Sequence, residues 1–188
     1  MRKTMTRLSL IVCVFLVLMA ISGYSQSAKT HSVSDWKISF PFGKTNDYSN
    51  ILVTRVVDGD TLVLENRERV RLIGIDTPEM HESNKLYRDS KRSKQDTKTI
   101  QALGKRAYEF TTQLVEGKRM SLEFDVEKND TYGRLLAYVY LKDGTFVNAE
   151  IVKQGYASLM SIPPNIKNAD LFQVLYKEAR EQNRGLWR

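Results

Sequence analysis

The sequence predicts an α+β fold that is mainly β, a five-stranded barrel accompanied by three helices. Five short segments are rich in β-branched residues or alternate between polar and apolar positions, which is typical of strands. Three other segments repeat apolar residues at helical spacing, and Gly or Pro turns separate the elements. The 188 residues suffice for one domain with a hydrophobic core. With 41% hydrophobic and 27% charged residues, the composition excludes a chain that is disordered throughout.

The N-terminal segment is typical of a targeting signal. Arg2, Lys3 and Arg7 precede a charge-free apolar run at 8–21, and small residues follow. This pattern predicts a secretory signal peptide over 1–25. The run is shorter than the roughly 20 residues of a membrane span, and an uncleaved N-terminal anchor is the alternative. We therefore expect a secreted or periplasmic protein without stable membrane association after signal cleavage.

The remaining chain divides into a polar segment at 26–48, expected to be a linker, and a folded domain at 49–188. The net charge of +7 favours anionic partners such as nucleic acid or a membrane surface. The single cysteine, Cys13, excludes a disulfide framework and a cysteine-based zinc site. Neither His31 nor His81 lies in a recognisable nucleophile motif. We expect the chemistry to depend on carboxylates, arginines, tyrosines or a metal.

The first part of the domain is expected to form three strands. Residues 51–57, 61–64 and 70–75 are rich in β-branched and other apolar residues. Asp58 and Gly59 form a turn between the first two, and a short polar turn separates the second from the third.

The second part mixes helices and strands. Its expected elements are a long basic loop at 81–99, helices at 100–116, 146–154 and 169–182, and strands at 120–126 and 134–141. A five-stranded barrel with a helix between the third and fourth strands is the OB-fold arrangement. Another α+β fold with five short strands is the alternative. The basic loop would either follow a nucleic-acid backbone or be solvated.

The second and third strands are expected to bring two aspartates together. Pairing Leu64 with Val70 places Asp60 almost opposite Asp76, at one end of the hairpin. Two close carboxylates repel unless one is protonated or a cation lies between them. With the Thr77 carbonyl, they offer the oxygen ligands that Ca²⁺ prefers and leave positions for water and a phosphate. Alternatively, the two aspartate segments are ordinary turns.

Three further residues suggest phosphodiester chemistry. Glu79 lies just beyond the pair of aspartates, where a carboxylate could orient or deprotonate an attacking water. Arg71 lies on the third strand, which leads to Asp76. Arg134 follows a turn that leads into the fifth strand. Guanidinium groups bind phosphate oxygens in pairs and stabilise developing negative charge. A surface salt bridge is the alternative for each arginine taken alone.

Three separate motifs resemble the staphylococcal (micrococcal) nuclease, or thermonuclease, family. They are Val-Asp-Gly-Asp-Thr at 57–61, Arg-Leu-Ile-Gly-Ile-Asp-Thr-Pro-Glu at 71–79 and Asp-Thr-Tyr-Gly-Arg at 130–134, and the similarity extends over about 51–188. The resemblance implies an OB-fold, Ca²⁺-dependent phosphodiesterase that acts outside the cytoplasm. Such an enzyme would hydrolyse DNA and RNA, prefer single-stranded or frayed substrate, and leave 3′-phosphate ends.

The resemblance also implies a role for individual positions. The implied roles are Ca²⁺ ligation for Asp60, Asp76 and Thr77, catalysis for Arg71, Glu79 and Arg134, and terminal-phosphate binding for Tyr132. Thr131 departs from the family pattern, where a lysine is usual, and Ser161 and Pro163 stand where base-stacking tyrosines are usual.

Other functions remain open at this point. A non-catalytic nucleic-acid-binding module of the same fold is the alternative, although the acids and arginines of the family are present together. An enzyme that acts on another phosphodiester is a third possibility. No protein partner is implied, and we expect a monomer.

Overall fold

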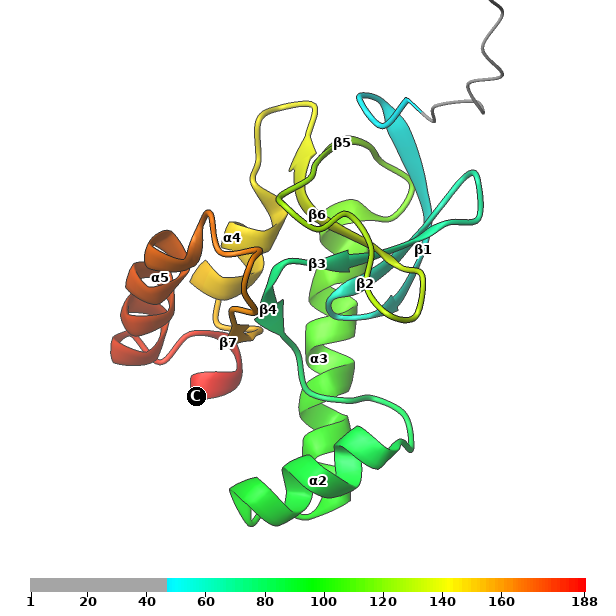
Figure 1. The fold of residues 1–188 in the computed structure, drawn as a ribbon. Coiled ribbons are helices and arrows are strands. Elements are labelled where there is room, and N and C mark those ends of the chain that lie inside the picture. The colour runs from blue at the N-terminus through cyan, green and yellow to red at the C-terminus, as the bar shows by residue number, and fades with distance from the viewer. Residues whose placement is uncertain (1–46) are drawn as a thin grey trace, which may run out of the picture. The chain divides into compact units, whose positions relative to one another are not determined.

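The computed structural model describes residues 47–188 and contains a closed five-stranded barrel with helices around it (Figure 1). The expected signal peptide, and the expected linker up to residue 46, lie outside the described residues. The barrel runs in the order β1-β2-β3-β6-β5, and β4 pairs with β7 separately. The strands are β1 Ile51–Asp58, β2 Thr61–Leu64, β3 Arg69–Leu72, β4 Gly74–Asp76, β5 Arg119–Glu123, β6 Leu135–Leu141 and β7 Ser158–Met160. The predicted five-stranded barrel is confirmed.

The helices differ from the prediction in number. Within residues 47–188 they are α2 Asn84–Ser93, α3 Thr97–Val115, α4 Val147–Lys153 and α5 Ala169–Glu181, with a short 3-10 helix, η2, at Gly185–Trp187. The three expected α-helices are present, and α2 is a fourth. Figure 1 shows α3 running from the barrel to α2, which crosses its far end. None of the helices in this part of the chain has both the length and the apolar character needed to cross a bilayer.

The prediction of a loop at 81–99 is wrong because α2 has no apolar stripe. Leu86 is its one buried residue, so the helix lacks the apolar repeat that identifies most helices in a sequence. The helix begins instead at a cap, where the Ser83 hydroxyl accepts a hydrogen bond from the Leu86 amide at 3.0 Å. It ends at Lys94, which has a left-handed backbone conformation.

The long helix α3 covers the barrel with one face. Asp96 caps its start by accepting a hydrogen bond from the Thr99 amide at 3.0 Å. Its buried residues recur at intervals of three or four and are Ile100, Gly104, Ala107, Thr111 and Val115.

At the N-terminal boundary of the domain, Tyr48 is also buried and packs edge-on against Phe124. The last residue of the expected linker therefore belongs to the hydrophobic core.

The expected third strand is split at Gly74 into β3 and β4. Gly74 has a φ of +83°, in the left-handed region that favours glycine, and the ring of Phe172 packs where a Cβ would lie. The buried Asn148 fixes this bend, because its amide donates to the Ile73 carbonyl at 3.0 Å while its carbonyl accepts from the Val139 amide at 3.0 Å. The bend turns the chain that follows towards the start of β2.

The register of the hairpin differs from the prediction by two residues. Thr61 pairs with Arg71, and the Leu72 amide donates to the Asp60 carbonyl at 2.9 Å, so Asp60 lies opposite Leu72 rather than Ile75 or Asp76. The prediction paired Leu64 with Val70, whereas the turn is tighter and the Leu64 amide donates to the Glu68 carbonyl at 2.9 Å. The two aspartates nevertheless converge, because the bend at Gly74 returns the chain to the same end of the barrel.

Candidate active site

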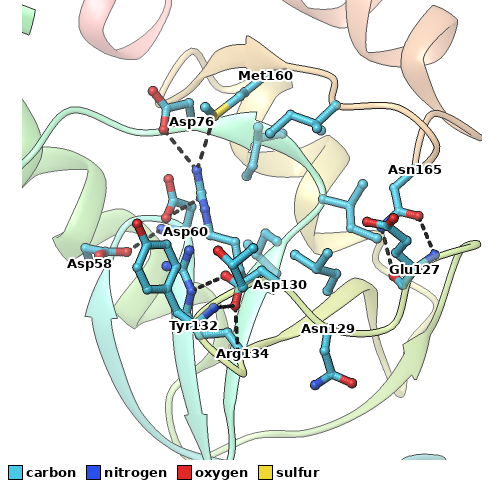
Figure 2. A pocket seen from close by; sticks show the side chains of 18 of the residues that line it. Asp58, Asp60, Asp76, Glu127, Asn129, Asp130, Tyr132, Arg134, Met160 and Asn165 are labelled. Carbon is cyan, nitrogen blue, oxygen red and sulfur yellow. Dashed lines mark hydrogen bonds and ion pairs between the residues drawn. The ribbon is translucent and has the colours of Figure 1, made fainter. Parts of the chain in front are cut away.

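A cleft of about 720 Å³ opens at this end of the barrel (Figure 2). The strands β3 and β4, the first turns of α2, the segment 127–134 and part of the 158–166 segment line it. Its charged and aromatic lining includes Asp58, Asp60, Arg71, Asp76, Glu79, Lys85, Arg88, Asp130, Tyr132 and Arg134. Six of the seven predicted site residues therefore line one cleft. The seventh, Thr77, is buried directly behind Asp60.

Arg71 lies between the two predicted ligand carboxylates. Its Nη2 donates to Asp76 Oδ1 at 2.9 Å, and its Nη1 forms an ion pair with Asp60 Oδ1 without hydrogen-bond geometry. The other oxygen of Asp60 accepts hydrogen bonds from the Thr77 amide at 2.8 Å and the Thr77 hydroxyl at 3.0 Å. Burial alone would raise the pKa of Asp60, but Arg71 and the Thr77 amide outweigh it and lower that pKa.

Asp58 adds a carboxylate that the sequence reasoning left without a role. Burial, and then the neighbouring Asp60, raise the pKa of Asp58 to about 7. Burial also raises the pKa of Asp76, in spite of Lys85 and Arg71 beside it. This end of the cleft therefore holds more carboxylates than its cations neutralise. Under that condition an added cation binds well.

Lys85 is a second residue that the sequence reasoning did not place in the site. Its Nζ lies 3.2 Å from Asp76 Oδ1, 2.9 Å from Glu79 Oε1 and 3.0 Å from the Thr77 carbonyl. Burial alone would lower the pKa of Lys85, but the carboxylates of Asp76 and Glu79 outweigh it and raise that pKa. The position could not be read from the sequence, because it depends on the packing of the unpredicted helix α2.

Glu79 is positioned by a close approach to α3. A Cβ at Gly104 would lie 2.6 Å from the carbonyl carbon and oxygen of Glu79, so the absence of a side chain lets the two backbones touch. Ser83, the cap of α2, donates to Glu79 Oε2 at 3.4 Å. The carboxylate is thus held between the two helices while remaining on the cleft wall.

Arg134 lies on a different part of the cleft wall and is held by a local turn. Asp130 Oδ1 accepts hydrogen bonds from the amides of Tyr132 and Arg134, each at 2.9 Å, and Oδ2 accepts from Arg134 Nε at 2.6 Å (Figure 2). Burial would raise the pKa of Asp130, but the bonds from Arg134 and the turn lower it. Tyr132 is 85% exposed, and its ring lies 5.6 Å from the Arg134 guanidinium carbon.

A two-bond clamp anchors the segment that carries this turn. The Glu127 amide donates to Asn165 Oδ1 at 2.8 Å, and Asn165 Nδ2 donates back to the Glu127 carbonyl at 2.8 Å (Figure 2). Asn165 is 5% exposed, so these bonds satisfy a buried amide. The clamp ties the 127–134 segment to the chain that follows β7.

The oxygen donors at the rim fit a hard divalent cation. Asp60 and Asp76 supply carboxylates and Thr77 supplies a carbonyl, and the Lys85 ammonium already serves as a stand-in cation on two of these three residues. Over residues 47–188, no group of three or more His, Cys, Asp or Glu side chains is arranged as a ready-made metal site. The expected Ca²⁺ ligands are not such a group, because they include only two acidic side chains, Asp60 and Asp76, and the third ligand is the backbone carbonyl of Thr77.

Comparisons with known proteins match most of the part of the chain that the structure describes. The family described as Staphylococcal nuclease homologue matches residues 69–188, a span that begins after Asp60 and includes the other predicted site residues. A thermonuclease from Staphylococcus intermedius is 40% identical over 139 residues, covering 72% of this chain and 74% of the relative. A thermonuclease from Staphylococcus hyicus is 32% identical over 138 residues, covering 72% and 73%. Endonuclease YncB from Bacillus subtilis strain 168 is 30% identical over 204 residues, covering 96% and 90%.

Proposed function

The chain belongs to the family of staphylococcal nuclease homologues, and from this premise we propose that it is an exported, Ca²⁺-dependent nuclease for DNA and RNA. Its activity as a hydrolytic phosphodiester endonuclease follows from the family and its relatives. The finer proposal includes a preference for single-stranded substrate and products with 3′-phosphate ends. The observation that carries it is the convergence of two aspartates, Glu79 and two arginines on one cleft.

Glu79 is the group that acts on the attacking water. Its carboxylate lines the cleft beside the aspartates and is held in place by Ser83 and by the packing of its backbone on Gly104. A carboxylate held near a bound phosphate can accept a proton from water as the new P–O bond forms. The fixed backbone keeps that carboxylate in reach of the reacting water.

Arg71 and Arg134 bind the scissile phosphate. Both line the cleft, and each guanidinium is directed by a carboxylate, Arg71 by Asp76 and Arg134 by Asp130. Such preorganised cations stabilise the negative charge that accumulates on the phosphate oxygens in the transition state. A phosphate that binds Arg71 must compete for its guanidinium with the carboxylates of Asp60 and Asp76.

The metal would be held by Asp60, Asp76 and the Thr77 carbonyl. When bound, a divalent cation would supply positive charge next to the scissile phosphate and lower the pKa of a coordinated water. Ca²⁺ suits this set because all its donors are oxygens and because the set leaves ligand positions for water and substrate.

The exposed side chains at the cleft support an unpaired nucleic-acid substrate. Tyr132 and Ile162 both line the cleft and are 85% and 60% exposed. Aromatic faces stack on bases that are not already stacked in a duplex. Tyr132 would thereby contact the nucleotide next to the phosphate that Arg134 binds. The expected signal peptide at 1–25 supports export.

The test is cleavage of heat-denatured DNA by the wild type and by Glu79→Gln, each with CaCl₂ and with a Ca²⁺ chelator. Glu79→Gln should lower kcat by about 10²–10⁴-fold because the water loses its proton acceptor. Glu109→Gln removes the same charge from the exposed face of α3 and serves as the control. The chelator should abolish cleavage, and CaCl₂ should restore it. Wild-type rates in Glu79→Gln would dismiss the role of Glu79, and full activity in chelator would dismiss the Ca²⁺ dependence.

A further inference from the structure

Lys85 occupies the position where a cation meets the oxygens of the proposed metal site. Its ammonium contacts Asp76, Glu79 and the Thr77 carbonyl at 2.9–3.2 Å, and its side chain is 25% exposed. Two of these three residues are the ligands expected for Ca²⁺. The ammonium therefore uses the same oxygen atoms that a metal ion would need.

The local sequence does not explain this placement. Lys85 lies in the first turn of α2, where the positive end of the helix dipole disfavours a cation, and that turn contains no acidic residue. By contrast, Lys91 and Arg92 lie in the last turn of the helix, where the dipole favours a cation. The carboxylates contributed by β4 and the segment after it are thus what holds the Lys85 ammonium.

The ammonium and a divalent cation cannot use these oxygens together. Ca²⁺ binds oxygen at about 2.3–2.6 Å, and the ammonium lies 3.0 Å from the Thr77 carbonyl and 3.2 Å from Asp76 Oδ1, so the two cations would lie within about 6 Å of each other. Two positive charges at that distance repel each other even near a protein surface, and the double charge of a divalent ion doubles the repulsion. Binding of the metal therefore requires that Lys85 leave.

We propose that Lys85 is a resident counter-cation of the metal site, which Ca²⁺ must displace, and that it thereby sets the Ca²⁺ affinity of the protein. The inference rests on the proposed Ca²⁺ dependence and adds the residue that regulates the site. On leaving, Lys85 has a partner on its own helix, because Asp89 Oδ2 lies 3.9 Å from its Nζ. Metal binding is thus coupled to the first turns of α2, where Arg88 also lines the cleft.

The first experiment is calorimetric titration of CaCl₂ into the purified full chain, without nucleic acid. Lys85→Met keeps the length of the side chain and removes the charge, and Lys91→Met makes the same change at an exposed position of the same helix. Lys85→Met should bind Ca²⁺ at least fivefold more tightly than the wild type, and Lys91→Met should match the wild type. In the absence of metal, Lys85→Met should also melt at a lower temperature, because its carboxylates lose a partner.

The second experiment uses the wild type and does not depend on how a variant folds. Lysines are acetylated briefly by an amine-reactive reagent, with and without saturating CaCl₂, and the extent at each lysine is measured by mass spectrometry. Lys85 should be protected in the metal-free protein and should react several-fold faster with CaCl₂. Lys91 should react at the same rate in both conditions.

The outcomes separate this inference from the function on which it rests. If the wild type binds Ca²⁺ and Lys85→Met binds it equally or less tightly, or Lys91→Met gains as much, the inference is overturned and the Ca²⁺ site stands. A Lys85 reactivity that CaCl₂ leaves unchanged overturns it too. If the wild type binds no Ca²⁺ and cleaves DNA in chelator, the proposed Ca²⁺ dependence fails first and the inference fails with it.

Discussion

The two arginines of the cleft are held in contrasting ways. Arg71 lies on β3, its side chain is 14% exposed, and carboxylates from two separate segments, Asp60 and Asp76, flank it. Arg134 precedes β6, its side chain is 29% exposed, and one carboxylate four residues earlier in the chain holds it. The first arginine is part of a buried charge network, whereas the second is oriented by a local turn. One half of the site should therefore be inseparable from the stability of the fold, and the other half should not.

The largest expected effect comes from removing each arginine in turn. Arg71→Met and Arg134→Met should both lower kcat by at least about 10²-fold, because each removes a cation that stabilises the transition state. Arg71→Met should also cost about 3–5 kcal/mol of unfolding free energy in metal-free buffer, since it leaves buried carboxylates unpaired. Arg134→Met should cost about 1 kcal/mol or less. Urea unfolding measures both, and equal losses of stability would contradict the contrast.

A smaller effect is expected from Gly104→Ala, which acts on the acidic half of the cleft alone. The new Cβ would meet the Glu79 backbone at 2.6 Å, so Glu79 should shift away from the reacting water. A displacement of about 1 Å lowers kcat by roughly 10²-fold. Ala102→Gly, at an exposed position of α3, controls for the change in helix propensity. Steady-state kinetics measures the result, and wild-type kcat in Gly104→Ala would show that this contact does not position Glu79.

The smallest expected effect concerns pH and the turn that holds Arg134. The pKa of Asp130 is lowered in the folded protein, so its ionised form stabilises the fold above its unfolded pKa of about 3.8. That contribution is lost as the pH falls from about 5 through the lower folded value. The free energy of unfolding of the wild type should exceed that of Asp130→Asn by about 1 kcal/mol at pH 6. This difference should shrink as the pH drops towards 3.

Thermal unfolding of both proteins between pH 3 and pH 6, in metal-free buffer, measures this difference. Asp143→Asn is the comparison for a turn without an arginine, because Asp143 accepts from the Thr145 amide at 2.9 Å after the end of β6 and has no contact with an arginine in the described residues. Hydrogen bonds from Thr145 also lower the pKa of Asp143, so Asp143→Asn should show a smaller loss of stability over the same pH range. A difference that stays constant over the pH range would show that the ionised Asp130 does not contribute to the stability of its turn.

The parts of the fold that could be predicted are those with a local signal. The barrel strands follow from β-branched and alternating residues, and α3 follows from its apolar repeat. The turn around Arg134 is also local, because Asp130 accepts bonds within four residues of itself. By contrast, α2 was missed because its only strong signal is the Ser83 cap. The hairpin register was wrong because the turn after Leu64 is tighter than predicted, with Arg67 in a left-handed conformation.

The site divides in the same way. The family motifs identified the two aspartates, Glu79 and both arginines, and the structure places them in one cleft. Lys85 and Asp58 were not assigned roles, although both line that cleft. A lysine in a polar segment has no feature in the sequence that tells whether it faces water or a carboxylate cluster.

The amino-acid sequence by itself determined the barrel, the three motifs and the residue types that can bind a cation and a phosphate. Only the tertiary structure decided that Gly74 would turn Asp76 back towards Asp60, and that Lys85 would meet the same oxygens from a separate helix. The physical reason is that periodicity and turn preferences act over a few residues, whereas the charges of a site are summed over every segment that folding brings within a few ångströms.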